Sequence, residues 1–162
     1  MSQKKKKTSL QTGELVVCNN AKARHNYHIE ERMEAGMALV GSEVKSLRMR
    51  QGNLDGAYAT IDSGEVFLHK MNIASYEHAT VFGHEPKRSR KLLLHRRQIE
   101  RLIGKLAVRG FTLIPLRVYF KNGRAKVELG LAKGLKTGDT REDIKRRIDL
   151  REARSAMGKG RR

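Results

Sequence analysis

The sequence predicts a mainly β protein with helices: a small antiparallel β-barrel, akin to an oligonucleotide-binding fold, with two to three flanking helices and a basic C-terminal tail. Two turn signals, Asp62-Ser63-Gly64 and Asn122-Gly123, each join strand-like stretches into a hairpin. Residues 65–69 place apolar side chains on both faces of a strand, which suits a closed or doubly covered sheet. An amphipathic helical pattern lies between the two hairpins.

The first elements are expected to be strands followed by a short helix. Residues 26–40 alternate unevenly between apolar and polar side chains, which indicates one or two strands. Ser42 is predicted to be the N-cap of a helix that Gly52 ends, with Val44 and Leu47 at helical spacing.

The second helix has the strongest periodicity in the chain. His95 is its predicted N-cap, with Gln98 three residues later, and Gly110 is the expected residue just beyond its C-terminus. Four apolar residues at spacings i, i+3, i+4 and i+7 form one stripe: Ile99, Leu102, Ile103 and Leu106.

The second hairpin follows this helix. Pro115 in its first strand predicts a sheet edge or a bulge, because proline has no backbone N–H to donate. Its second strand alternates strictly, so one face is expected in the core and the other in solvent. The core face consists of Ala125, Val127, Leu129 and Leu131.

Composition divides the chain into three parts. Residues 1–18 are polar and lysine-rich, and we expect a disordered basic arm. Residues 19–132 form the predicted barrel domain, and residues 133–162 form the basic tail. In the tail, Ile144 and Ile148 lie four residues apart among basic residues, which indicates a segment that is unstructured alone and becomes a basic helix on a partner.

The charge of the chain predicts a nucleic-acid partner. The net charge is +18 and the sequence pI is about 10.5, and the charge is spread over the whole chain rather than confined to its ends. Such a charge accelerates association with polyanions and makes binding fall with salt. A generic solvated basic surface is the alternative. Aromatic residues make up 5% of the chain and tryptophan is absent, so recognition of a folded RNA by shape and backbone fits better than base stacking.

The remaining bulk features predict a cytoplasmic protein. Cys18 is the single cysteine, so no disulfide framework exists and a reducing compartment is expected. No apolar run approaches the length of a membrane span, and no apolar segment follows the N-terminal lysine cluster as in a signal peptide.

Several patterns resemble catalytic or ligand motifs without completing them. GLAKGLKTGDTR, residues 130–141, has three residues between its glycines and Leu135 where a P-loop has lysine. His25 and His28, near Glu30, fall on opposite faces of a strand and do not converge on a metal or on an RNA phosphate. We therefore predict no catalytic site, no metal site and no cofactor.

The stretch EPKRSRKLLLHRR, residues 85–97, has two readings. Its cations, Arg90 and Lys91 among them, are predicted to form a ridge that grips phosphates, and an exposed leucine among them would pack against a base or sugar. Alternatively, the leucines belong to a strand that enters the core between solvated flanks.

Three stretches together resemble one family, the bacterial transfer-messenger-RNA-binding proteins called small protein B (SmpB). They are NNAKARHNYHIEERMEAGMALVGSEVKSLR, EPKRSRKLLLHRR and GLAKGLKTGDTR, in this order. The resemblance implies a non-enzymatic adaptor that binds the tRNA-like domain of transfer-messenger RNA and delivers it to stalled ribosomes. It implies that the protein body replaces the missing anticodon arm, and that the tail enters the decoding centre and the empty mRNA channel as a helix. The implied partners are transfer-messenger RNA, the ribosome, and elongation factor Tu with the alanyl-charged RNA.

The resemblance also assigns residues. For two of the residues that it assigns to RNA binding, a structural role is the alternative. Asn20 could instead form a turn or a helix cap. Glu34 could instead be a buried carboxylate that braces the barrel, since an acid rarely grips phosphate. The residues expected to contact RNA are Asn20, Lys22, Arg24, Glu34, Arg90, Lys91, Leu93, Lys133 and Lys136. Those expected to contact the ribosome are Arg141, Ile144, Lys145, Arg146, Arg147, Ile148 and Arg151.

The chain departs from the family pattern just after the last strand. Leu135 replaces one of two paired lysines, Gly138 stands at a histidine position, and Thr140 replaces a lysine. Gly138 has no side chain to stack or hydrogen-bond in the decoding centre. Two other classes stay open from the residues alone: a structural ribosomal or assembly protein, and a ribonuclease.

Overall fold

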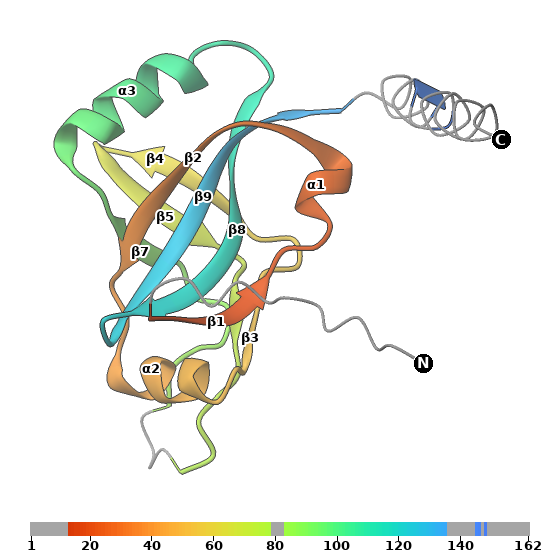
Figure 1. Cartoon of the computed structure of the whole chain (residues 1–162). Helices are drawn as coiled ribbons and strands as arrows, with labels where there is room; N and C mark the ends of the chain where they lie inside the picture. The colour runs from red at the N-terminus through yellow and green to blue at the C-terminus, as the bar shows by residue number, and fades with distance from the viewer. Residues whose placement is uncertain (1–12, 79–82, 136–144, 147, 149–162) are drawn as a thin grey trace, which may run out of the picture.

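The computed structural model describes residues 13–78, 83–135, 145–146 and 148 (Figure 1). Within them, six antiparallel strands pair in the ring β8-β4-β5-β7-β2-β9, which the β8–β9 pairing closes into a barrel. β1 pairs with β8 outside the ring, and β3 with β6 in a separate ribbon. The strands are β1 (Glu14–Asn19), β2 (Tyr27–Met37), β3 (Gly52–Asn53), β4 (Tyr58–Asp62), β5 (Glu65–His69), β6 (Asn72–Ile73), β7 (Arg90–Leu93), β8 (Phe111–Lys121) and β9 (Arg124–Gly134).

Both predicted hairpins are confirmed. Ser63 and Gly64 between β4 and β5 have φ of 50° and 76°, and Asn122 and Gly123 between β8 and β9 have φ of 51° and 75°. Two successive residues in the left-handed region are what a two-residue hairpin turn requires. The predicted irregularity at Pro115 is also confirmed, because the register of β8 against β9 shifts between Pro115 and Arg117.

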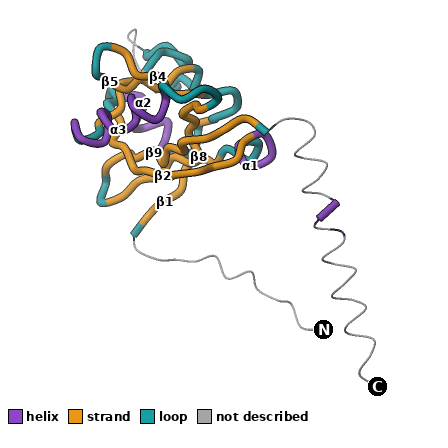
Figure 2. Tube along the Cα trace, turned by 90° about the horizontal axis from the view of Figure 1, so that it is seen from above, coloured by secondary structure: helices purple, strands orange, loops and turns teal. Residues whose placement is uncertain are grey.

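Two helices lie at opposite ends of the barrel (Figure 1). α2 (Gly41–Arg48) buries Leu47, and α3 (Arg96–Leu106) buries Leu102. Seen from above, they lie between the β2–β9–β8 layer and the β4–β5 layer (Figure 2). A short helix, α1 (Ala23–Asn26), packs on the outside of the barrel near the end of β9 (Figure 1).

The predicted start of α3 is confirmed, and its apolar stripe is narrower than predicted. His95 is the N-cap, and its backbone N–H donates to Gln98 Oε1 at 3.0 Å. Ile103 is 47% exposed, because the helix touches the barrel mainly along the line of Leu102.

The predicted limits of α2 were wrong. The helix begins at Gly41 after Val40, because the Glu43 carboxylate accepts a hydrogen bond from the Val40 N–H at 3.0 Å. Ser42 instead bonds the His84 ring at 2.9 Å. The helix ends at Arg48, and Gly52 lies in β3.

The barrel interior forms one hydrophobic core. Its most buried members come from β5, β7, β8 and β9, from the two end helices, and from the segments that connect the strands around β3 and β6. Among the described helices, none is long and apolar enough to cross a membrane. The core residues with no exposed surface include Leu47, Val66, Leu68, Leu113, Val118, Val127, Leu129 and Leu131.

Candidate nucleic-acid interface

Four strands present a charged ladder on the outer face of the barrel. In the strand register, Glu128 of β9 lies opposite both Glu34 of β2 and Arg117 of β8. The Arg117 guanidinium bridges Glu128 at 3.1 Å and Glu14 of β1 at 3.3 Å. The two like charges of Glu34 and Glu128 are tolerated as neighbours because each carboxylate has its own cationic partners.

Glu34 is the centre of a second set of contacts. Its Oε2 accepts a hydrogen bond of 2.5 Å from the Tyr119 hydroxyl and one of 3.3 Å from Lys121 Nζ. Lys126 Nζ lies 3.6 Å from Oε1. The Tyr119 hydroxyl is the main reason that the pKa of Glu34 lies below its ordinary value; partial burial opposes this effect, and the two lysines add to it.

The same contact affects Tyr119. Burial raises the pKa of Tyr119 well above its ordinary value, and the hydrogen bond to Glu34 raises it further. At neutral pH the carboxylate is therefore ionised and the phenol is a permanent donor. The hydrogen bond from the Tyr119 hydroxyl therefore holds Oε2 of Glu34 against β8.

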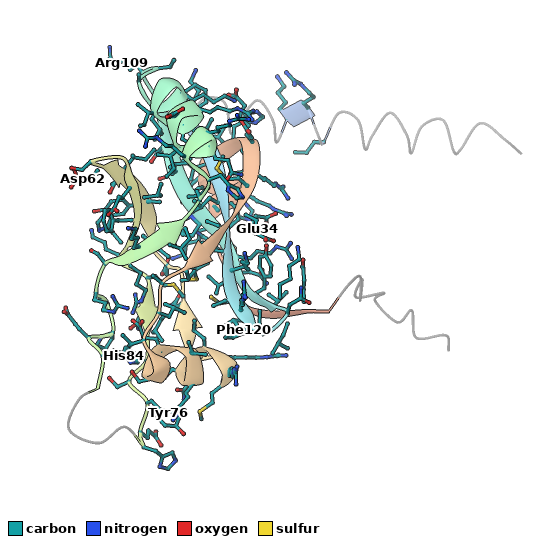
Figure 3. All side chains as sticks on the ribbon, turned by 90° about the vertical axis from the view of Figure 1, so that its left-hand side faces the viewer. Glu34, Asp62, Tyr76, His84, Arg109 and Phe120 are labelled. Atoms are coloured by element: carbon teal, nitrogen blue, oxygen red, sulfur yellow. The ribbon has the colours of Figure 1, made fainter. Side chains whose placement is uncertain are left out.

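The bracing role left open for Glu34 is present in the structure. The contacts of Glu34 join β2 to β8 and β9, although its side chain is 36% exposed rather than buried. Figure 3 shows Glu34 on the same side of the barrel as Phe120, away from Asp62. Glu34 is thus both a structural contact and an accessible acceptor.

A groove opens beside Glu34. It has a volume of about 700 Å³ and lies between β2, the end of β7, the tip of the β8–β9 hairpin and the start of α3. Leu93 is 54% exposed at its edge. Gly36 lies next to Leu93, and a Cβ on Gly36 would lie 3.3 Å from the Leu93 Cβ, so a larger residue there would crowd the groove. The residues that line the groove include Leu94, His95, Arg124, Ala125 and Lys126.

Asn20 holds α1 on the barrel. Its side-chain amide donates to the Pro115 carbonyl at 3.0 Å and its side-chain oxygen accepts from the Ala23 N–H at 3.1 Å. Ala23 then packs with Ile114 and Ala132 in a small second core. The cap or turn role that the sequence left open for Asn20 is therefore the one that the contacts show, and it fixes the exposed residues of α1.

Several predicted contact residues are exposed. Lys22 pairs with Asp55 at 3.1 Å, an exposed ion pair that contributes little stability and opens readily. Lys91 pairs with Glu65 across β7 and β5 and is 44% exposed. Arg24 on α1 and Lys133 on β9 are also exposed.

The prediction that Arg90 grips phosphate is wrong. Arg90 is fully buried, and its Nε donates to Glu43 Oε1 at 2.8 Å. Its other N–H groups donate to the carbonyls of Met71 and Pro86 at 2.7 and 2.9 Å, so the guanidinium is occupied within the fold. Of the cations in this stretch that were assigned to RNA, Lys91 remains accessible. Both interpretations of the leucines apply, each to a different residue: Leu92 is buried in the core, as expected for a strand, and Leu93 is exposed, as expected for a residue that packs against RNA.

Most of the tail lies outside the described residues. This applies to Lys136, Arg141, Ile144, Arg147 and Arg151, and to Gly138 and Thr140. Lys145, Arg146 and Ile148 are described as exposed residues in helical conformation. β9 continues to Gly134, so residues 133 and 134 of the predicted tail belong to the barrel, and the Leu135 N–H still donates to the Asn26 carbonyl at 3.0 Å.

Sequence reasoning missed Tyr119, Lys121 and Arg117. The signal was available, because a two-residue turn at Asn122-Gly123 fixes the register and pairs Tyr119 with Lys126. His25, expected in a strand, lies in α1. In the parts of the chain that the structure describes, no group of three or more His, Cys, Asp or Glu side chains is placed to hold a metal.

Comparisons with known proteins agree on one family. The family model described as SmpB protein matches residues 17–159. The SsrA-binding protein of Desulforudis audaxviator is 56% identical over 147 residues, which cover 90% of this chain and 96% of the relative. That of Geobacter metallireducens is 53% identical over 145 residues, covering 90% and 95%. A solved structure described as "tmRNA-SmpB: a journey to the center of the bacterial ribosome" matches with a TM-score of 0.64 and 44% identity, covering 78% of this chain and 93% of the other.

Proposed function

The chain belongs to the SmpB protein family, and from this membership we propose that it binds transfer-messenger RNA and acts with it on ribosomes in trans-translation. The observation that carries the proposal is the extent of the similarity. The family match runs through the barrel and into the tail, and the relatives are matched over more than nine tenths of their own length. The net charge of +18 supplies the attraction to RNA.

We propose that the barrel recognises the tRNA-like domain of this RNA and replaces its missing anticodon arm. The groove and the surface around α1 supply the contacts. Leu93 offers apolar area, Glu34 accepts hydrogen bonds, and Asn20 positions α1. The proposed phosphate contacts are Lys22, Arg24, Lys91, Lys133 and Lys136.

We propose that the tail acts after delivery. It enters the decoding centre and the empty mRNA channel as a helix, with Ile144 and Ile148 on one face. Elongation factor Tu carries the alanyl-charged RNA to the same complex, in the cytoplasm. The protein contributes recognition and placement rather than catalysis.

The test of RNA recognition is a binding titration against the transcribed tRNA-like domain, with excess ordinary tRNA at near-physiological salt. We expect tight binding that survives the competitor, because shape and specific contacts add to charge. Binding erased by tRNA would contradict the proposal and favour a structural ribosomal protein. Cleavage of the RNA during incubation would instead indicate a ribonuclease.

The affinity is expected to fall steeply with salt. Each phosphate that a cation neutralises contributes about −0.7 to −0.9 to the slope of log K against log salt. Replacing Arg24 or Lys133 with alanine should reduce the magnitude of that slope by about one unit each, because one phosphate contact is lost. Arg48→Ala, on α2 at the opposite end of the barrel from α3, is the control; Arg48 is exposed and is assigned no RNA contact, so this variant should leave the slope unchanged. If the slope for the Arg24 and Lys133 variants equals the wild-type slope, these two residues do not contact phosphates.

A further inference from the structure

The outer face of α3 carries a glycine that the fold itself does not require. Gly104 is an exposed residue inside the helix, its φ is not positive, and a Cβ on it would meet no atom within 4 Å. Glycine lowers helix stability relative to alanine, because it has more backbone freedom to lose on folding. A helical glycine without an internal reason is expected where another molecule approaches the backbone closely.

Two exposed apolar side chains lie beside Gly104. Ile103 is 47% exposed, and Val108, in the turn that follows α3, is 56% exposed. At about 3.6 residues per turn, Gly104 lies on the side of the helix opposite Leu102, the residue that α3 buries in the barrel. The apolar surface of α3 therefore extends beyond the part that the core covers, and it flanks a point without a side chain.

The rim of this surface is strongly cationic. Residues 95–110 contain five lysine or arginine residues and one acid, Glu100, which pairs with Arg96 at 3.2 Å. Arg97 and Arg109 are exposed, and neither forms an ion pair within the part of the chain that the structure describes. Figure 3 shows Arg109 at the top of the molecule, well away from Glu34. A partner that is complementary to this face therefore carries negative charge. We call the surface the α3 face, and it consists of Arg97, Arg101, Ile103, Gly104, Val108 and Arg109.

The apolar centre of the α3 face distinguishes a protein partner from RNA. The outside of an RNA helix presents phosphates and sugar hydroxyls, so it would pair with the arginines but leave Ile103 and Val108 without apolar contact. A protein helix with an apolar stripe and acidic flanks matches both parts of the face. Packed helix axes lie about 8–10 Å apart, depending on the side chains at the contact, and the missing side chain at Gly104 permits a close approach.

We propose that the α3 face is a docking surface for an acidic amphipathic helix of a partner protein. The apolar side chains of that helix pack against Ile103 and Val108, over Gly104. Its carboxylates pair with Arg97 at one end of the face and with Arg109 at the other. The inference goes beyond the proposed function and does not depend on it, since the α3 face includes none of the residues that we assign to RNA.

The test uses the full-length protein and a synthetic probe, a helical peptide of about 18 residues with leucines on one face and glutamates elsewhere. Binding is followed through the amide NMR shifts of the protein, in a titration up to millimolar peptide. A second peptide of the same composition has its leucines scattered around the helix, so it carries equal charge without an apolar face. We expect the amphipathic peptide to shift the signals of Gly104 and its neighbours, and to bind about fivefold or more tightly than the scattered peptide.

Three variants separate close approach from charge. Gly104→Gln places a neutral side chain over the contact and should weaken binding of the amphipathic peptide about fivefold or more. Its midpoint of urea unfolding should equal or exceed that of wild type, because glutamine is a better helix former than glycine and the space outside is open. Arg97→Gln should weaken peptide binding about two- to fivefold, whereas Arg48→Gln, which removes the same charge from α2, should leave it unchanged.

Each contrary outcome overturns the docking surface. No peptide binding up to millimolar concentration would remove it, equal binding of the two peptides would mean that charge alone attracts them, and wild-type binding by Gly104→Gln would mean that nothing approaches that backbone. A short RNA duplex that shifts Gly104 more strongly than the peptide does would assign the α3 face to RNA. Gly104→Gln should keep the wild-type affinity for the tRNA-like domain, and a loss there would have the same meaning. Failure of the wild type to bind that domain would overturn the proposed function and leave this inference unaffected.

Discussion

Replacing Glu43 with alanine is expected to lower the free energy of unfolding by about 3–5 kcal/mol, the range found when one partner of a buried ion pair is removed. Glu43 and Arg90 have no exposed surface. Without the carboxylate, Arg90 keeps a buried charge with no counterion, and Arg88 loses a two-point contact at 2.8 and 2.6 Å. The Val40 N–H also loses its partner at the start of α2.

The measurement is urea unfolding followed by circular dichroism, with Glu65→Ala as the control. Glu65 pairs with Lys91, the neighbour of Arg90 on β7, but both side chains of that pair are more than 40% exposed. An exposed pair contributes about 0–1 kcal/mol, so this variant should unfold almost as wild type does. Equal losses for the two variants would contradict a special role for the buried network.

The same network predicts how stability depends on pH. Burial alone would raise the pKa of Glu43, but hydrogen bonds from Arg88 and Val40 and the charge of Arg90 outweigh it and hold the pKa below its ordinary value. A carboxyl with a lowered pKa in the folded state stabilises the fold above its unfolded pKa, and this stability is lost as the pH falls. The stability gap between wild type and Glu43→Ala should therefore narrow in acid.

The buried network also marks the limit of what the sequence could predict. Both hairpins were predictable because turn chemistry is local: Ser63-Gly64 and Asn122-Gly123 need no distant partner. Arg90 was not, because its counterion is 47 residues away on α2, and a burial that depends on such a partner leaves no local pattern. The run of cations around it is typical of a surface, and only the fold separates Arg90 from Lys91.

The start of α2 and the role of Asn20 also depended on distant partners that the local sequence does not show. Ser42 is a good N-cap by type, but the distant His84 bonds its hydroxyl and Glu43 supplies the cap contact instead. Asn20 was expected to contact RNA, with a turn or cap as the alternative, and its bond to the Pro115 carbonyl, 95 residues away, shows the structural use. Residue types thus predict which groups carry polar contacts, whereas tertiary structure decides whether those contacts face inward.

In the tail, Ile144→Asp combined with Ile148→Asp is expected to abolish peptide tagging while sparing affinity for the tRNA-like domain. The two isoleucines lie four residues apart, on one face of the helix that we propose the tail forms on the ribosome. Aspartates there replace apolar contact with charges that ribosomal RNA repels, whereas none of the proposed contacts to the tRNA-like domain involves Ile144 or Ile148. Both quantities are measured on the same protein, by RNA titration and by a reconstituted tagging assay.

The matched control for the tail is Ile144→Leu with Ile148→Leu, which keeps apolar area at both positions and should retain tagging. If the aspartate variant also loses RNA affinity, the tail belongs to the RNA-binding surface and the two steps are not separable. If it tags normally, the basic residues around positions 145–147 are sufficient and the apolar face has no role. The expected result, binding without tagging, would assign recognition to the barrel and the later ribosomal step to the tail, in a chain whose Gly138 has no side chain to contribute to that step.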